Sequence, residues 1–578
     1  MDRLNNFWFA AQAETTINHW KTHYPDSCAH VMAQASNICQ NTFVFREHWE
    51  MERTNEAVTF PGKVIWDHMP AGDPEWIYAL NRHTCFLILG KAWRLTGDET
   101  YAAKFVELLS GWIHQCPLTD KSRNNTWRSL EAGIRIENWL KSFILFSNSP
   151  LFTKELREKA DETLRLHANY LMEVNLPFHH LSNWGVLQNH GLALLGLYFD
   201  NPEWVRESVR RLDRETYMQV FSDGTQWEQS PMYHCEVMYA LMDSLLHLKR
   251  FHEPVPKRLT EAVHQMVHTL AYWCKPNGHI PCQGDSDDID ARDQISMGAI
   301  LFNDETLKFL SQGVIDEENL WTFGAKGLEA YQALPAIVPE ETSKFLADSG
   351  NYMLRSGWEP SSDYLRFHCG AMGSGHGHGD QLHIDYYSAG EDILIDPGRY
   401  TYVDSAIRRE LKLPSGHNTV CVDGEEFCEC INSWGYSRMA VPVKGECRFS
   451  GGVNFAMAGH LGYLDKGIFA TRKVVTLEEG LILIADVFYG NGLHSYDCRF
   501  HFGHLGEAAL LSDGTDGPVR VHFEGQNVKA EVLALRGTGS LSKANCSPEY
   551  NLLQTCGCLL VHHTQEGTAS LYTVISNT

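Results

Sequence analysis

The residues best suited to chemistry lie in Gly375-His376-Gly377-His378-Gly379-Asp380, where a single glycine separates two histidines. Alternate glycines let the backbone turn tightly and bring both imidazoles near one point. Asp396 follows eighteen residues after His378, and His417 comes later in Gly416-His417-Asn418. Two histidines and a carboxylate suit a zinc ion that keeps a fourth position open. A Gly-rich turn with solvated histidines would explain the same spacing, because ligands on separate strands follow no fixed rule.

A second group of polar residues opens a predicted helix, with Ser182-Asn183-Trp184 followed by Gln188-Asn189-His190. Asparagine and neutral histidine can both donate hydrogen bonds to a carboxylate without acting as competing bases. An N-terminal cap and a core amide are the structural alternative for the same residues.

A third group runs from Asp223-Gly224 through Glu228 to Tyr233-His234, again at the start of a helix. A tyrosine, with a pKa of about 10, is a poor base unless a positive neighbour lowers that value. Packing is the alternative reading for a lone tyrosine at this position.

A fourth group precedes and enters another helix, with Asn125, Trp127 and Arg128 ahead of Arg135. Aromatic and arginine side chains suit sugar stacking and carboxylate pairing. An exposed loop before an amphipathic helix accounts for the pattern equally well. The acidic run Gly284-Asp285-Ser286-Asp287-Asp288 has the composition of a calcium loop but lacks EF-hand spacing.

The elements that would position these groups change character along the chain. Up to about residue 340, apolar residues recur at spacings of three and four, as in Ser129–Phe146 and Pro231–Phe251. Short polar loops join these segments, which favours stacked helical hairpins in a solenoid or an α/α toroid. No clean repeat is visible, so we expect the toroid.

After about Lys344 the segments become short and β-prone, as in Tyr352–Arg355 and Leu481–Ile484, with Gly, Asp and Asn turns between many of them. Many short strands without intervening helices predict an antiparallel sandwich. The fold class is therefore a multidomain α + β chain, with a toroid over residues 1–340 and a β-sandwich over 341–578.

Bulk composition narrows the possible partners. The 578-residue chain carries a formal net charge of −24, which argues against general nucleic-acid binding. Its 16 cysteines include no CxxC pair, which is typical of reduced, mostly buried thiols. Residues 1–20 show no secretory signal and no apolar run is long enough for a membrane span, so we expect a cytoplasmic protein. A homo-oligomer is left open.

Taken together, these motifs resemble the heparinase II/III-like polysaccharide lyases, a family that includes heparin/heparan sulfate lyases and oligoalginate lyases. The resemblance covers nearly the whole chain in order. It rests on the four groups above and on two further motifs, Asp348-Ser349-Gly350…Leu354-Arg355-Ser356-Gly357 and Asp396-Pro397-Gly398…Tyr402. It implies an N-terminal α/α toroid, a C-terminal antiparallel β-sandwich and an acidic oligo- or polysaccharide substrate.

Residue by residue, the resemblance implies a catalytic tyrosine at Tyr233 and a catalytic histidine at His376. Asn189 and His190 are similar to the pair that meets the substrate carboxylate, with Asn183 as a rival for that role. One zinc ion, mainly structural, is implied at His378, Asp396 and His417. We expect substrate contacts from the following residues: Asn125, Trp127, Arg128, Arg135, Asn183 and Glu228.

The implied reaction is β-elimination at a uronate, which yields a 4,5-unsaturated product. Donors on the carboxylate stabilise the enolate-like intermediate, a base removes the C5 proton and an acid protonates the C4 oxygen. Tyr233 or His376 can be the base, and the cleft is expected between the two domains. Heparin or heparan sulfate is favoured as substrate, with Arg408, Arg409 and Lys412 as nearby positive charges.

Four alternatives stay open at this point. An oligoalginate or other uronate lyase would share the fold. A toroid glycoside hydrolase would use two carboxylates, for which Glu228 and Asp285 are candidates. A hydrolytic zinc enzyme would use the metal to activate water. A non-catalytic glycan-binding protein would need neither Tyr233 nor His376.

Overall fold

The computed structural model describes residues 3–477 and 480–577, which group into two compact units. The first unit contains the chain up to Gln219 together with Glu236–His264 and Asp293–Ile337. The second contains Val220–Cys235, Gln265–Arg292 and the chain from Val338 onward. The change of sequence character predicted near residue 340 lies next to Val338. The two earlier segments of the second unit were predicted as part of the helical domain, yet they pack with the strands.

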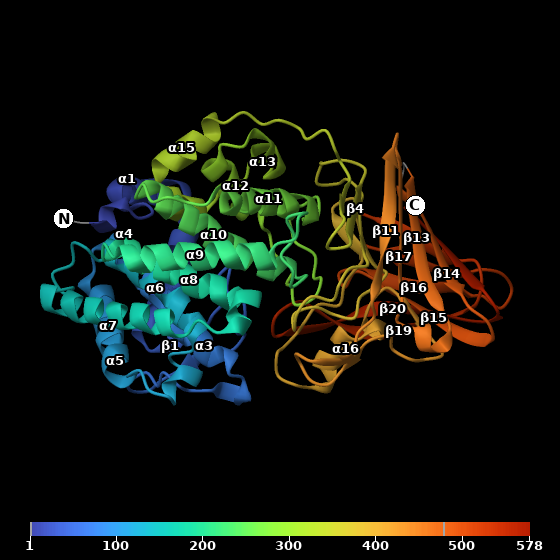
Figure 1. Ribbon diagram of the computed structural model, residues 1–578, viewed down its shortest axis with the longest axis horizontal. Helices are drawn as coiled ribbons and strands as arrows, with labels where there is room; N and C mark the ends of the chain where they lie inside the picture. The colour runs from blue at the N-terminus through green and yellow to red at the C-terminus, as the bar shows by residue number, and fades with distance from the viewer. Residues whose placement is uncertain (1–2, 478–479, 578) are drawn as a thin grey trace. The chain divides into compact units, whose positions relative to one another are not determined.

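The first unit is built from helices (Figure 1). Those that lie wholly within it are α1 (Ala13–His23), α2 (Pro25–Cys39), α3 (Glu75–Arg82), α4 (Thr84–Thr96), α5 (Glu99–Gln115), α6 (Ser129–Leu145), α7 (Lys154–Glu173), α8 (Asn183–Tyr198), α9 (Pro202–Gln219), α13 (Glu305–Leu310), α14 (Glu317–Phe323) and α15 (Ala325–Ala333). Helices α10 (Pro231–Arg250), α11 (Lys257–Trp273) and α12 (Arg292–Phe302) begin in the second unit or end in it. A short hairpin is formed by β1 (Thr42–Phe43) and β2 (Val58–Thr59).

Helix α8 packs closely against α6 and α9. Nearly all of its residues are buried, as expected for a helix that is apolar on every side. Glycines allow the close approach to α6, because a Cβ on Gly191 would lie 2.6 Å from the carbonyl oxygen of Gly133. By contrast α9 buries one stripe, which includes Trp204, Val205 and Leu212. The core of the unit is rich in fully buried tryptophans such as Trp112 and Trp139.

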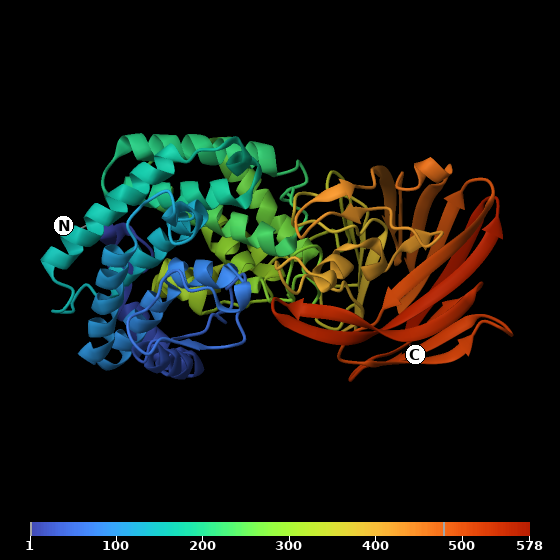
Figure 2. The same ribbon diagram turned by 90° about the horizontal axis from the view of Figure 1, so that it is seen from below.

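The second unit is built mainly from antiparallel strands. Its largest sheet has the order β11-β12-β13-β14-β21-β18-β17-β16, and Figure 2 shows these long strands running side by side in orange and red. The strands are β11 (Pro442–Ser450), β12 (Val453–His460), β13 (Phe469–Leu477), β14 (Leu481–Tyr489), β16 (Glu507–Asp513), β17 (Val519–Glu524), β18 (Lys529–Ala534) and β21 (Ala569–Asn577).

Burial alternates along these strands because one face of the sheet packs on the core. In β14, Ile482 and Ile484 are buried whereas Leu483 between them is 39% exposed. A four-stranded sheet, β19-β20-β15-β8, shares the same core. Its strands are β19 (Thr538–Glu549), β20 (Leu552–Glu566), β15 (Leu493–His501) and β8 (Val420–Val422). The small pair β9 (Glu429–Cys430) and β10 (Tyr436–Arg438) lies in the segment that follows β8.

A five-stranded antiparallel sheet carries most of the chemistry-bearing loops. It contains β3 (Lys344–Leu346), β4 (Asn351–Arg355), β5 (Tyr364–His368), β6 (His383–Ser388) and β7 (Glu391–Leu394). Every residue of β4, β5 and β6 is buried, so their ends are held firmly. The loop between β5 and β6 contains His376 and His378, and Asp396 follows β7. The short helix α16 (Ala406–Lys412) leads to His417.

Two general expectations concern the chain as a whole. No helix among the described residues is both long enough and apolar enough to cross a membrane. The 16 cysteines all lie within the described ranges, and each is a free thiol, as predicted.

Candidate active site

Tyr233 and His376 lie together within the second unit. Tyr233 stands in the first turn of α10, and His376 is on the glycine-rich loop between β5 and β6. Their rings are stacked, with centroids 3.6 Å apart and planes at 20°. The Tyr233 hydroxyl lies 2.6 Å from that of Tyr402. The two residues predicted to move protons are therefore neighbours, although 143 positions separate them in the sequence.

Arg399 places a positive charge beside the pair of phenols. It is fully buried, donates to the Tyr402 hydroxyl at 2.6 Å and is paired with Asp287 at 2.8 Å. Burial by itself would lower the pKa of Arg399, but Asp287 and the two tyrosines outweigh it and raise the pKa. The guanidinium thus stays charged and favours negative charge on a phenol oxygen.

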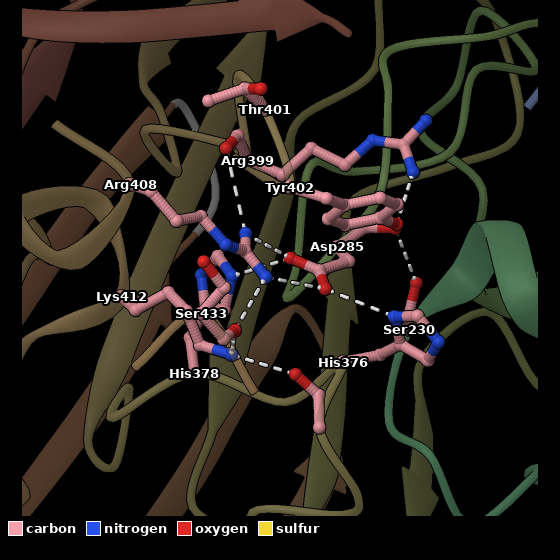
Figure 3. A network of polar contacts seen from close by, with 12 residues as sticks. Ser230, Asp285, His376, His378, Arg399, Thr401, Tyr402, Arg408, Lys412 and Ser433 are labelled. Carbon is pink, nitrogen blue, oxygen red and sulfur yellow. Dashed lines mark hydrogen bonds and ion pairs between the residues drawn. The ribbon is translucent and has the colours of Figure 1, made fainter. Parts of the chain in front are cut away.

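Asp285 lies at the centre of a second group of contacts, drawn in Figure 3. One carboxylate oxygen is 3.0 Å from His376 Nδ1, and the other is 3.0 Å from His378 Nε2. Arg408 donates to both oxygens. Burial alone would raise the pKa of Asp285, but Arg408 and the two histidines hold that pKa well below its usual range. The side chain is a permanently charged acceptor.

The loop that carries the two histidines is tightly constrained. A Cβ on Gly377 would lie 1.5 Å from the carbonyl oxygen of Met372, so only glycine fits there. Tyr436 donates to the Gly377 carbonyl at 2.9 Å, and Lys412 donates to the Gly375 carbonyl at 2.6 Å. The prediction that alternate glycines shape this loop agrees with these contacts.

The positive charges expected near the substrate have other partners. Arg408 and Lys412 are fully buried, and they hold Asp285 and backbone carbonyls respectively. Burial and the neighbouring Arg408 lower the pKa of Lys412 to about 7. Arg409 is exposed but pairs with Asp404 at 2.6 Å. Arg408 and Lys412 therefore lie near the site, as expected, but their charges face buried groups of the protein.

His378, Asp396 and His417 form a cluster that could hold a metal ion. One potential ligand atom from each residue lies within 4.8 Å of the other two, and all three residues are buried. His378 Nδ1 and His417 Nε2 are buried without a hydrogen bond, and His417 Nδ1 lies 3.5 Å from Asp396 Oδ2. Buried polar atoms without a partner are costly, and a cation would satisfy them. Burial lowers the pKa of His378 to about 4, which keeps it in the neutral form that a metal requires.

A neighbouring group, His383, Asp385 and Asp396, fits a metal less well. His383 Nε2 already lies 2.6 Å from Asp385, and its Nδ1 accepts the Asn418 backbone N–H at 3.0 Å. Asp385 is also bound by the fully buried Arg366. The unpartnered ring atoms therefore favour His378, Asp396 and His417 as the metal ligands.

Asn189 and His190 belong to the first unit and do not form the predicted pair of donors. The Asn189 amide donates to Glu215 at 2.8 Å, and His190 Nε2 lies 2.7 Å from Asp243. Both residues are 2% exposed. Burial alone would lower the pKa of His190, but Asp243 outweighs it and raises the pKa. Since each side chain is bound to a different buried carboxylate, the clamp prediction needs correction.

The predicted sugar contacts of the first unit divide into two groups. Trp127 is 1% exposed and donates to the Cys116 carbonyl at 2.7 Å, and Arg135 is fully buried and donates to the Thr126 carbonyl. Both are core residues, which corrects their assignment as substrate contacts. Their residue types suggested sugar binding, but in the structure both side chains serve packing.

The other residues of this set are closer to the surface of the unit or to a helix end. Asn125 is partly exposed and Arg128 has 14% of its side chain exposed, with its guanidinium 3.3 Å from the centre of the Tyr78 ring and 5.0 Å from that of Trp184. Arg128 also pairs with Glu131. Asn183 is only 3% exposed and is kept as a candidate for its position as the first residue of α8, directly after the capping residue Ser182. These three remain candidates for substrate contacts.

Comparison with known proteins decides the family. A model described as Heparinase II/III N-terminus matches residues 8–309, more than half of the chain, and one described as Heparinase II/III-like, C-terminal matches residues 338–569. The chain belongs to the heparinase II/III family. The family expected from the sequence is thereby confirmed.

Curated relatives and solved structures agree with this membership. The heparinase II/III chain is 25% identical over 383 residues to a heparin-sulfate lyase of Pedobacter heparinus and 22% identical over 416 residues to one of Bacteroides stercoris. These alignments cover 63% and 67% of this chain but only 55% and 58% of the relatives, so the chain spans little more than half of their length. A crystal structure of heparinase III has a TM-score of 0.78 at 20% identity, covering 95% of this chain and 85% of that one. This likeness confirms the predicted fold, an α/α toroid followed by an antiparallel β-sandwich.

The geometry of this heparinase II/III member argues against a hydrolase built on Glu228 and Asp285. A glycosidase needs one carboxyl group with a raised pKa to act as the acid. Asp285 has a strongly lowered pKa and no exposed surface. Glu228, predicted to bind substrate, is 1% exposed and lies 3.6 Å from His376 Nε2. It therefore belongs to the surroundings of His376.

Two side chains close to His376 were missed or misread in the sequence. Asp285 was considered only as a hydrolase carboxylate or part of a calcium loop, although the acidic run that contains it was noticed. Trp434 was not singled out at all. It is 43% exposed, and its ring lies 5.3 Å from that of His376 and 4.6 Å from that of Tyr402. No spacing signal connects Trp434 to either residue.

Proposed function

We propose that this chain is a polysaccharide lyase that cleaves a glycan of the heparin or heparan sulfate type at a uronate by β-elimination. The observation that carries the proposal is the stacked pair of Tyr233 and His376 beside the Arg399-supported phenol of Tyr402. The names of the curated relatives support the substrate class. Arg408 and Lys412 of α16 are fully buried, so they give no support for a sulfated substrate.

The reaction needs only a proton shuttle and a group that stabilises negative charge. A base takes the C5 proton, and the electron pair of the C5–H bond forms the C4–C5 double bond. The C4–O bond breaks, and the departing oxygen takes a proton from the acid. No water is consumed. We propose Tyr233 for the transfer at O4 and either Tyr233 or His376 for the transfer at C5.

The stacking of the two rings supports transfer from one side of the sugar. A pyranose ring cannot lie between rings whose centroids are 3.6 Å apart, so both groups approach the substrate from the same side. This arrangement suits a uronate whose C5 hydrogen and C4 oxygen share one face, as in glucuronate. It is less suited to iduronate, in which they lie on opposite faces.

We propose Asn183 as the donor to the substrate carboxylate, in place of Asn189 and His190. It begins α8, where the backbone N–H groups of the first turn favour negative charge. Trp184 and Arg128, its neighbours in the first unit, offer an aromatic ring and a guanidinium for the same sugar.

We also propose one zinc ion at His378, Asp396 and His417. Three protein ligands of these types suit zinc, and the unpartnered ring nitrogens support the assignment. A bound zinc would fix the loop that carries His376. The proton transfers themselves are assigned to the side chains of this chain.

An oligoalginate or other uronate lyase is the alternative within the same fold. The expectation that the protein is cytoplasmic stays a prediction. The test is ultraviolet absorbance of the product, because a C4–C5 double bond conjugated to the carboxylate absorbs and a hydrolysis product does not. Purified protein would be assayed on heparin, heparan sulfate, hyaluronan, chondroitin sulfate and alginate. Cleavage without a rise in absorbance, or no cleavage of any uronate glycan, would overturn the proposal.

A further inference from the structure

We propose that Asp285 is a positioning residue that orients the catalytic His376 and the metal ligand His378 through the two oxygens of one carboxylate. The proposal rests on the proposed function for the role of His376. It makes proton transfer and metal binding depend on one side chain that bonds to both histidines and lies about ninety positions before them in the sequence.

The carboxylate of Asp285 is fully used by these contacts. Oδ2 is 3.0 Å from His376 Nδ1 and 2.8 Å from one Arg408 nitrogen. Oδ1 is 3.0 Å from His378 Nε2 and also accepts from Arg408. Four donors occupy the roughly four acceptor positions of a carboxylate. Since Asp285 is 0% exposed, no substrate atom can replace one of them.

These contacts fix which ring nitrogen of each histidine carries a proton. A charged carboxylate only accepts, so His376 must carry hydrogen on Nδ1 and His378 on Nε2. His376 is then left with Nε2 as its basic atom, on a side chain with 13% of its surface exposed; this Nε2 lies 3.6 Å from Glu228 Oε2, beyond the length of a hydrogen bond. His378 is left with Nδ1, the buried atom that makes no hydrogen bond and belongs to the candidate metal group. A carboxylate behind a ligating histidine orients the ring and raises its basicity.

The backbone around Asp285 is held independently of its side chain. The Asp285 N–H donates to the His376 carbonyl at 2.9 Å, and Ser230 donates to the Asp285 carbonyl at 2.9 Å. Replacing the carboxylate by an amide therefore leaves these links in place. Asp285→Asn keeps the shape of the side chain but offers one acceptor oxygen instead of two, so only one histidine can keep its acceptor.

The first experiment measures zinc content, kcat and KM of Asp285→Asn. The matched control is Asp486→Asn, because Asp486 is likewise buried and is held by two hydrogen bonds from the buried Arg472, but contacts no histidine. We expect Asp285→Asn to lose roughly 10- to 100-fold in zinc affinity, as is typical for outer partners of metal ligands. We expect kcat to fall by about 10²-fold with KM changed far less, whereas Asp486→Asn keeps both zinc and kcat.

Full zinc content together with near wild-type kcat in folded Asp285→Asn would overturn the proposal. Equal losses in both variants would do the same, because they would indicate a general effect on stability. If the unsubstituted protein forms no unsaturated product, the proposed function fails. The zinc affinity of Asp285→Asn still tests whether Asp285 orients the metal ligand His378.

A second measurement on the unsubstituted protein covers the case in which Asp285→Asn does not fold. Nitrogen NMR of ¹⁵N-histidine-labelled protein reports the tautomer of each ring, with His376→Ala and His378→Ala used to assign the signals. We expect the Nδ1–H form for His376, and for His378 hydrogen on Nε2 with zinc on Nδ1. The opposite tautomer at His376, or zinc on His378 Nε2, would refute the positioning role.

Discussion

His376 with Asp285 in the second unit and His190 with Asp243 in the first are chemically alike but differ in their surroundings. Each pairs an imidazole with a carboxylate of 0% exposure, at 3.0 Å and 2.7 Å respectively. His190 is 2% exposed and lies within α8, whereas the His376 side chain keeps 13% of its surface and stacks on Tyr233. The His376 pair thus differs from the His190 pair in having an accessible ring and a second group able to carry a proton, Tyr233, beside it.

The largest expected effect comes from removing that second proton carrier. Tyr233→Phe should lower kcat by about 10³-fold or more, the upper part of the range for general acid–base groups. The change removes one hydroxyl and leaves the stacked ring, so fold and zinc content should be retained. Product absorbance and elemental analysis provide the two measurements.

Tyr364→Phe is the matched control for Tyr233→Phe. Tyr364 is fully buried, and its hydroxyl donates to a backbone carbonyl at 2.7 Å, with no link to His376 in the contacts of the described residues. It should lose about 1 kcal/mol of stability and little activity. A Tyr233→Phe enzyme as active as Tyr364→Phe would remove the distinction between the two histidine pairs.

The next effect is expected at the metal group formed by His378, Asp396 and His417, two positions from His376 in the sequence. His417→Ala should abolish stoichiometric zinc binding and lower kcat by roughly 10- to 100-fold through the loosened loop. His460→Gln is the control, since His460 is equally buried in the second unit but lies outside the metal group. Zinc retained by His417→Ala at the wild-type level would contradict the ligand assignment.

For His190 the expected effect is on stability and not on turnover. His190→Gln removes one of the groups that hold the buried Asp243 carboxylate, to which Trp8 still donates at 2.8 Å, and should cost about 2 kcal/mol of unfolding free energy. Because His190 is bound to Asp243 and is not assigned as a donor to the substrate, kcat measured below the unfolding temperature should stay within about threefold of wild type. Loss of a donor that stabilises the intermediate would lower kcat far more. A loss of 10²-fold or more in kcat by a folded variant would restore His190 to the catalytic set.

The pH dependence of the unfolding free energy is a second test of the structural role of the His190–Asp243 pair. Asp243 raises the folded-state pKa of His190 above its unfolded value of about 6.5. Its stabilisation is therefore fully present below about pH 6.5 and is lost as the pH rises through the folded-state pKa. The difference in unfolding free energy between wild type and His190→Gln should shrink over that rise. A difference that grows with pH would contradict this sign.

The smallest effect is expected at Trp434, which gives His376 an exposed aromatic neighbour that His190 lacks. Trp434→Ala should raise KM by roughly three- to tenfold, the value of one aromatic contact, with kcat nearly unchanged. Trp434→Phe should recover most of the loss. If KM is unchanged in both variants, the exposed indole does not contact substrate.

Helix limits were largely predictable where a helix buries one face against its neighbours, because apolar residues then recur with the helical period. Ser129–Phe146 and Pro231–Phe251 were predicted, and the helices are Ser129–Leu145 and Pro231–Arg250. The glycine-rich loop was also predictable, since His376 and His378 are close in sequence. What joins them to Tyr233 and Asp285 is the path of the chain, and no local pattern encodes that path.

The misassigned residues fail for a common physical reason. Trp127, Arg135 and His190 have side chains that serve equally well in binding sites and in satisfied cores. Only burial and hydrogen-bond partners separate the two uses, and both come from tertiary packing. The same applies to Arg408 and Lys412, whose charges face inward to hold Asp285 and backbone carbonyls.

The fit of Gly377 under the Met372 carbonyl limits how the sequence of this loop can diverge. Any side chain at that position would collide with the backbone at 1.5 Å, so the loop that aims His376 cannot be altered in small steps. A change in glycan specificity must instead arise in segments without that steric constraint, such as the segment that carries Trp434. We therefore expect homologues with different glycan specificities to retain glycine at the equivalent of Gly377 and to vary at the equivalent of Trp434.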